Sequence, residues 1–81
     1  MAQAIITKFV NPTAARAPRV KATGWNGSVT ITWRDDLGVY GNHRAAAAEL
    51  INKFNAKAGI EFEITSHGEL PDESGYAFIV Q

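Results

Sequence analysis

The chain has 81 residues, no cysteine and equal numbers of basic and acidic side chains. This length supports one domain, residues 1–81, with a modest core, and without cysteine neither a disulfide nor a thiolate nucleophile can form. The first residues lack the charged start and long apolar core of a signal peptide, and no apolar run approaches the ~20 residues that span a membrane. We therefore expect a cytoplasmic protein with no membrane partner.

The charges are unevenly distributed along the chain. Residues 1–44 carry six basic and two acidic side chains, whereas residues 45–81 carry two basic and six acidic ones. Such asymmetry can mark a polyanion site. Two halves that pack together would also neutralise each other, and we take this second interpretation as the default.

The first part of the chain predicts three strands. Residues 3–10 are β-branched and apolar on both faces, which is typical of a well-covered strand. A loop bounded by two prolines follows at residues 11–18. Further strands are predicted at residues 19–25 and 28–33, because Asn26-Gly27 between them is the strongest short hairpin signal.

The middle of the chain predicts one helix. Residues 34–41 form a turn-rich loop, and residues 42–59 follow as the helix, with four consecutive alanines at 45–48. Asn42 stands at the N-cap position and Gly59 at the left-handed C-cap position. An apolar stripe at helical spacing should face the sheet, and it consists of Ala47, Leu50, Ile51, Phe54 and Ala58.

The last part of the chain predicts two more strands. Residues 60–65 alternate between apolar and polar side chains and predict a fourth strand, residues 66–74 a turn or loop, and residues 75–80 a fifth strand. The order of elements is therefore β-β-β-α-β-β. We expect an α+β fold in which a small antiparallel sheet carries one helix packed on one face.

The Asn26-Gly27 turn also predicts a register for its hairpin. In a two-residue loop Trp25 pairs with Ser28, and counting back from there places Arg19 opposite Arg34. One face of the hairpin is then apolar and should meet the helix, and the other is polar and basic.

The polar and basic face of this hairpin is the candidate binding face. The register assigns Trp33 to the core, whereas an exposed Trp25 among basic residues can stack on a base or anchor a protein interface. Glu61 and Glu63 are the alternative partners that would neutralise the arginines from a neighbouring strand. The candidate binding residues, for protein or nucleic acid, are Arg16, Arg19, Lys21, Trp25 and Arg34.

No catalytic residue and no metal ligand is predicted. We expect His43 to be exposed at the start of the helix, and His67 lies in a loop without the spacing of a metal site. Thr65-Ser66-His67 places hydroxyl groups beside an imidazole, but neighbours in a loop are not a positioned nucleophile and base. We predict a protein that is not an enzyme and needs no cofactor.

Several short motifs occur together along the chain: Asn11-Pro12-Thr13, Arg16, Arg19-Val20-Lys21-Ala22, Val29-Thr30-Ile31, Asn42-His43-Arg44-Ala45-Ala46, and Gly75-Tyr76-Ala77-Phe78-Ile79-Val80. In this combination the chain resembles a family of short uncharacterised proteins encoded by bacteriophages and other mobile genetic elements. It departs from the family pattern at Asn11 and at Ala17-Pro18. The resemblance implies a phage-like origin and action in the cytoplasm of a bacterial host, and it carries no activity to transfer.

Three functions follow as alternatives. The first is a small phage or mobile-element protein that binds a host protein or nucleoprotein complex and modulates or inhibits it. Inhibition of a host defence complex, such as a CRISPR effector, is an example drawn from the resemblance alone. The second is a nucleic-acid-binding module that uses the basic face, against which the zero net charge argues mildly. The third is a homo-oligomer, such as a homodimer, with a structural role.

Overall fold

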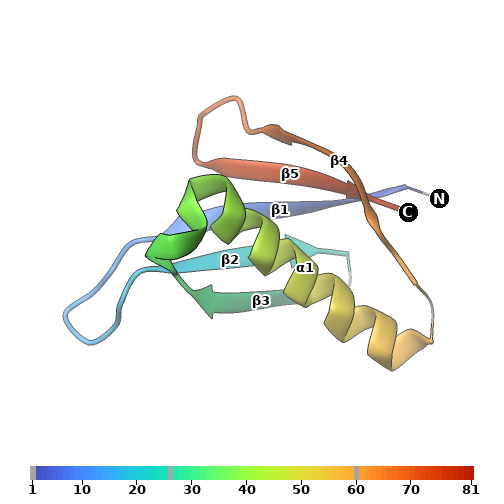
Figure 1. The fold of residues 1–81 in the computed structure, drawn as a ribbon, viewed down its shortest axis with the longest axis horizontal. Coiled ribbons are helices and arrows are strands. Elements are labelled where there is room, and N and C mark those ends of the chain that lie inside the picture. The colour runs from blue at the N-terminus through green and yellow to red at the C-terminus, as the bar shows by residue number, and fades with distance from the viewer. Residues whose placement is uncertain (1, 26, 60) are drawn as a thin grey trace.

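In the residues that the structure describes, a long helix lies across one face of a five-stranded antiparallel sheet (Figure 1). The computed structural model describes residues 2–25, 27–59 and 61–81. The elements are β1 (Gln3–Val10), β2 (Arg19–Gly24), β3 (Gly27–Thr32), the 3-10 turn η1 (Asp35–Leu37), α1 (Gly38–Ala58), β4 (Ile64–Glu69) and β5 (Gly75–Val80). The strand order in the sheet is β3-β2-β1-β5-β4. The predicted α+β class, the order of elements and the packing of the helix are confirmed.

The core lies between the helix and the sheet. Its buried apolar side chains are Ile5 of β1, Val20 and Ala22 of β2, Phe78 and Val80 of β5, and Ala46, Ala47, Leu50 and Ile51 of α1. The small alanines let the helix backbone approach the strands closely. The predicted stripe is thus confirmed at its centre, while Phe54 is half-buried and the side chain of Ala58 lies outside what the structure describes.

The helix begins at Gly38, so the predicted start at Asn42 is wrong. Asn42 is fully buried, and its side chain is hydrogen-bonded to the turn before the helix instead of capping the helix. Its Nδ2 donates to the carbonyl oxygens of Arg34 and Gly38, each at 2.7 Å, and its Oδ1 accepts from the backbone N–H of Arg34 at 2.8 Å. The predicted end is confirmed, because Gly59 has a left-handed φ of 70° and donates its N–H to Asn55.

The hairpin of β2 and β3 has a register two residues away from the predicted one. Thr23, and not Trp25, lies opposite Ser28, and the ladder closes with Gly24 opposite Gly27. Residue 26 of the predicted Asn26-Gly27 turn lies outside the described residues. A shift by two residues keeps every remaining strand residue on its expected face. The predicted pair of Arg19 with Arg34 is wrong, because Arg19 lies opposite Thr32.

The position of Trp25 explains this shift. Its ring packs edge-on against Phe54 of the helix and Phe62, with centroid distances of 5.4 and 5.3 Å. Trp25 therefore belongs to the helix side of the molecule, and its predicted place on the opposite face beside Lys21 is wrong. The expected exposure of Trp25 is confirmed, because 42% of its surface remains exposed, and edge-to-face contacts with both rings stabilise its position on the helix side.

The fourth strand lies further along the chain than predicted. It runs from Ile64 to Glu69, through part of the segment expected as a loop, and it is irregular between Ile64 and Ser66. Residue 60, the predicted first residue of this strand, lies outside the described residues. The preceding Phe62 is held by the side chain of Asn55, whose Oδ1 accepts its N–H at 3.0 Å. Because Phe62 is hydrogen-bonded to the helix, the strand begins only after it, at Ile64.

Within the described residues, no helix combines the length and the hydropathy that crossing a membrane requires.

Candidate binding face

The helix covers one face of the sheet and leaves the other without a covering element in the described residues (Figure 1). We call this second side the open face. Alternation along each strand and the observed pairings assign its residues. They are Ala4, Ile6, Lys8 and Val10 of β1, Arg19, Lys21 and Thr23 of β2, Ser28, Thr30 and Thr32 of β3, Ser66 and Gly68 of β4, and Gly75, Ala77 and Ile79 of β5.

Two lysines lie opposite each other on the open face. Lys8 of β1 pairs with Lys21 of β2, and their neighbours in the same row are Thr30 and Gly75. Like charges directly opposite across a strand pair repel each other. None of the open-face residues defined above is acidic. The carboxylate that acts on this pair comes from the β4–β5 turn: hydrogen bonds with Ser74 and, more weakly, the charge of Lys8 lower the pKa of Asp72.

Arg19 extends the basic character of the open face. Its side chain is half-buried, and its Nε has no hydrogen-bond partner among the described residues. Buried donors are nearly always paired in proteins. An acceptor from a bound molecule would satisfy this nitrogen.

An apolar strip runs beside the basic rows. Ile6 of β1 lies opposite Ala77 of β5, and Ala4 lies opposite Ile79. Ile6, Ala77 and Ile79 are half-buried although no helix covers them. The open face therefore combines an apolar centre with basic and hydroxyl-bearing side chains along one flank.

The predicted site residues do not form one patch. Arg19 and Lys21 share the open face, and Arg16 lies in the loop between β1 and β2, where its backbone exchanges hydrogen bonds of 3.0 and 3.2 Å with Thr13. Arg34 is separate, because its guanidinium forms an exposed ion pair with Asp36 at 2.8 Å. Trp25 lies on the helix side, as described above.

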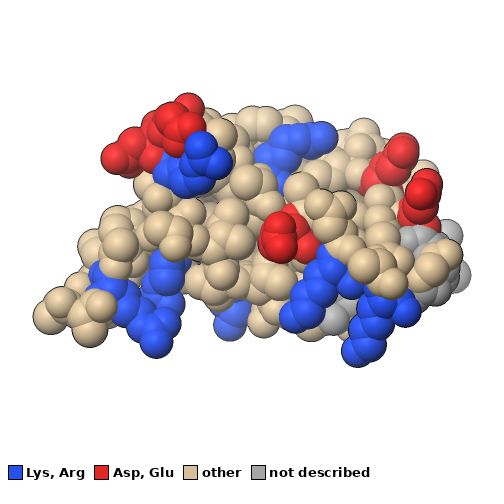
Figure 2. Space-filling model, turned by 60° about the horizontal axis from the view of Figure 1, so that its bottom comes forward, with Lys and Arg blue, Asp and Glu red and all other residues tan. Residues whose placement is uncertain are grey.

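Glu61 and Glu63, which the sequence analysis considered as internal partners of the arginines, lie near the opposite edge of the sheet from Arg19. Glu63 pairs through its backbone with Gln81, next to the β4 edge, whereas Arg19 belongs to β2 near the opposite edge. Within the described part of the chain, no ion pair joins Glu61 or Glu63 to an arginine. Figure 2 shows most Lys and Arg atoms along the lower border of the view and most Asp and Glu atoms along its upper border.

Lys8 is the open-face cation that the sequence analysis missed. Strand alternation alone would place it on the face opposite Ile5 and Thr7. Its pairing with Lys21 depends on the register of β1 and β2, and the long loop between these strands does not determine that register. The two lysines thus come together only through the tertiary fold.

His43 is buried, and its predicted exposure is wrong. The side chain is 3% exposed, and its Nδ1 lies 2.8 Å from Oγ1 of Thr7 in β1. Burial lowers the pKa of His43 from its ordinary value. The earlier start of α1 is the reason, because it moves His43 from the helix end into a turn that faces the sheet.

Of the other candidate groups, Thr65 donates its hydroxyl to the carbonyl of Ile79, and His67 packs on the ring of Tyr40 at a centroid distance of 4.6 Å. In the parts of the chain that the structure describes, no three His, Asp or Glu side chains are grouped to hold a metal ion.

Comparisons with protein-family models, curated proteins and solved structures give no match to this chain.

Proposed function

We propose that this chain is a small binding protein, not an enzyme, that docks its open face on an acidic surface of a host protein complex. The observation that carries this proposal is the pair of Lys8 and Lys21, which lie opposite each other on a face without carboxylates. A partner's carboxylates would relieve the repulsion between these lysines, and Nε of Arg19 would gain an acceptor.

The apolar strip favours a protein over a nucleic acid as the partner. An apolar centre with a polar rim is the usual anatomy of a protein–protein interface. Single-stranded nucleic acids are usually bound by aromatic side chains on which bases stack, and none of the open-face residues is aromatic. The resemblance to phage and mobile-element proteins suggests a bacterial host complex, and inhibition of a defence complex is the effect we propose.

A nucleic-acid-binding module is the second candidate. It is favoured by the hydroxyl groups of Thr23, Thr30 and Thr32 beside Lys21, since hydroxyl and ammonium groups both bind phosphates. This module would bind with an affinity that falls steeply as salt rises.

Capture from host lysate with immobilised protein tests the proposal. Nuclease-treated lysate should yield a partner protein with the wild type and lose it with Lys21→Glu. The matched control is Lys53→Glu, which makes the same charge change on the exposed side of α1. Lys21→Glu should unfold at or above the wild-type temperature, because it turns a repulsive pair into an attractive one.

The alternatives give different results in the same experiment. Capture that disappears with nuclease would favour the nucleic-acid module, and capture of the protein's own chain alone would favour a homo-oligomer. A folded Lys21→Glu protein that retains the partner at wild-type affinity would remove the open face from consideration.

A further inference from the structure

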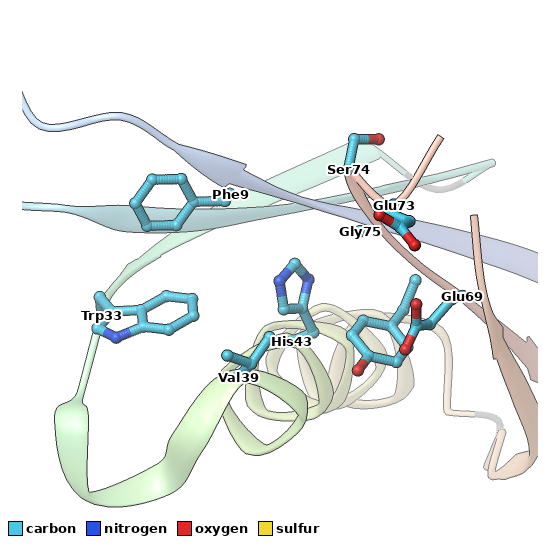
Figure 3. A pocket seen from close by; sticks show the side chains of 9 residues that line it. Phe9, Trp33, Val39, His43, Glu69, Glu73, Ser74 and Gly75 are labelled. Atoms are coloured by element: carbon cyan, nitrogen blue, oxygen red, sulfur yellow. The ribbon is translucent and has the colours of Figure 1, made fainter. Parts of the chain in front are cut away.

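A cavity of about 350 Å³ lies on the helix side of the molecule, beside the start of α1 (Figure 3). It is lined by residues from the ends of β1 and β4, from the first turns of α1, from the β4–β5 turn and from the start of β5, together with Trp33, which follows β3. Figure 3 shows Phe9 and Trp33 on one side, Glu69 and Glu73 on the other, and His43 between them. Apart from Gly75, which belongs to both, the residues that line the cavity lie outside the open face, and the two surfaces differ in charge.

The wall formed by Phe9 and Trp33 is aromatic. Their rings meet edge to face, with centroids 5.2 Å apart, and Trp33 meets His43 in the same way at 6.1 Å. Aromatic rings attract a cation held within a few ångströms. Beside them, Phe9 is 41% and Val39 is 60% exposed, so both offer apolar surface to a ligand.

The opposite wall is acidic. Glu69 ends β4, Glu73 lies in the following turn, and neither forms an ion pair with another described residue. No lysine or arginine is among the residues that line the cavity. The wall therefore carries two negative charges that a ligand of positive charge would neutralise.

His43 places its imidazole between these walls. Its Nδ1 lies 2.8 Å from Oγ1 of Thr7, and either atom can be the donor in this contact, depending on the tautomer. In the tautomer with its proton on Nδ1, Nε2 keeps its lone pair and can accept a hydrogen bond from a ligand.

We propose that this cavity binds a lysine side chain of a protein partner. The aliphatic stem of the lysine lies against Phe9 and Val39, as such stems commonly lie along apolar surface. Its ammonium group has three N–H donors, which match the carboxylates of Glu69 and Glu73 and Nε2 of His43.

The surroundings of the cavity favour a lysine within a protein over a free amine. Phe9 and Val39, which both line the cavity, are large apolar side chains with more than a third of their surface exposed. Apolar patches of this kind mark contacts with other macromolecules. A free amine would fill the acidic end and leave this patch in water.

The probe for this site is the lysine analogue Nα-acetyl-lysine methylamide. Its binding is measured by NMR as a change in the chemical shift of the indole N–H of Trp33. The analogue should shift this signal saturably, and the norleucine analogue, which lacks the ammonium, should not. Glu69→Gln and Glu73→Gln should each weaken binding about tenfold, the loss expected for one charge-assisted hydrogen bond. Glu49→Gln, on the exposed side of α1, should bind like the wild type.

A second variant at Glu73 distinguishes loss of binding from loss of the fold. Glu73 has a left-handed φ of 61°, which glycine adopts more easily, so Glu73→Gly removes the carboxylate without straining the turn. Equal shifts with the lysine and norleucine analogues, or unchanged binding by Glu73→Gly, would overturn the proposal. Tighter binding of spermidine would overturn the choice of a protein lysine, and tighter binding of the trimethyl-lysine analogue would overturn the three-donor arrangement.

Discussion

Nδ1 of His43 lies 2.8 Å from the hydroxyl oxygen of Thr7, and this bond joins helix α1 to the central strand β1. Both side chains are buried, so the contact is shielded from water. Because the imidazole is buried, the stability of the protein depends on whether it is protonated.

The first prediction concerns this dependence on pH. Burial lowers the pKa of His43 in the folded protein below its ordinary value of 6.5, so the unfolded chain takes up the proton at a higher pH than the folded one. The free energy of unfolding should therefore be fully maintained above about pH 6.5 and should fall as the pH decreases below it.

Urea unfolding on both sides of this pH measures the effect. The exposed histidine provides the control, because His67→Gln should keep the loss of stability that His43→Gln removes. Glu69 and Glu73 line the same cavity, and a hydrogen bond with Thr7 opposes the lowering of the pKa by burial without cancelling it. A free energy of unfolding that is equal at about pH 7.5 and about pH 5.5 would contradict the assignment.

The second prediction concerns Asn42. Asn42→Ala should lower the free energy of unfolding by about 2–4 kcal/mol, because it removes three hydrogen bonds and leaves the backbone N–H of Arg34 without its partner. The control is Asn52→Ala on the exposed side of the same helix, which should change stability by about 0.5 kcal/mol or less. Equal losses in the two variants would mean that Asn42 does not fasten the turn.

The third prediction concerns Gly75. A Cβ at this position would overlap the carbonyl oxygen of Thr7 and lie 2.8 Å from its carbonyl carbon, so Gly75→Ala must push β5 away from β1. The cost should exceed about 4 kcal/mol, and circular dichroism should show loss of the fold. Gly68→Ala is the matched change on β4, where a Cβ meets nothing within 4 Å, and it should leave stability unchanged or raise it.

The fourth prediction concerns the buried side of the helix. Leu50 is 2% exposed, and Leu50→Ala should cost about 2–5 kcal/mol through lost burial and the cavity left behind. The neighbouring Glu49→Ala should cost about 0.5 kcal/mol or less, because this side chain is exposed and forms no ion pair with a described residue. Chemical denaturation of both variants would show whether the two sides of α1 differ as described.

The elements with strong local patterns could be predicted from the sequence. The bounds of β1 and β5 agree with the expected strands, since both are bordered by turn residues and built from β-branched or aromatic side chains. The C-terminal end of α1 also agrees, because only a few residue types adopt the left-handed conformation of Gly59 easily.

The remaining features depend on contacts between distant parts of the chain. Asn42 resembles an N-cap in the sequence, but its partner is Arg34 in the preceding turn. Trp25 lies outside the predicted hairpin ladder because its ring packs against Phe54 and Phe62. The open face was expected from alternation, yet its facing lysines come from two strands joined by a loop that does not set their register.

The arrangement of the sheet has a consequence for folding during synthesis. The central strand β1 is the first element along the chain, and its neighbour β5 is the last. The β2–β3 hairpin and the helix rest on local contacts and can form early, whereas pairing of Ile5 with Phe78 closes a loop of nearly the whole chain. One flank of β1 thus stays unpaired until β5 has left the ribosome. A nascent chain paused before Gly75 would present this flank to any other strand nearby.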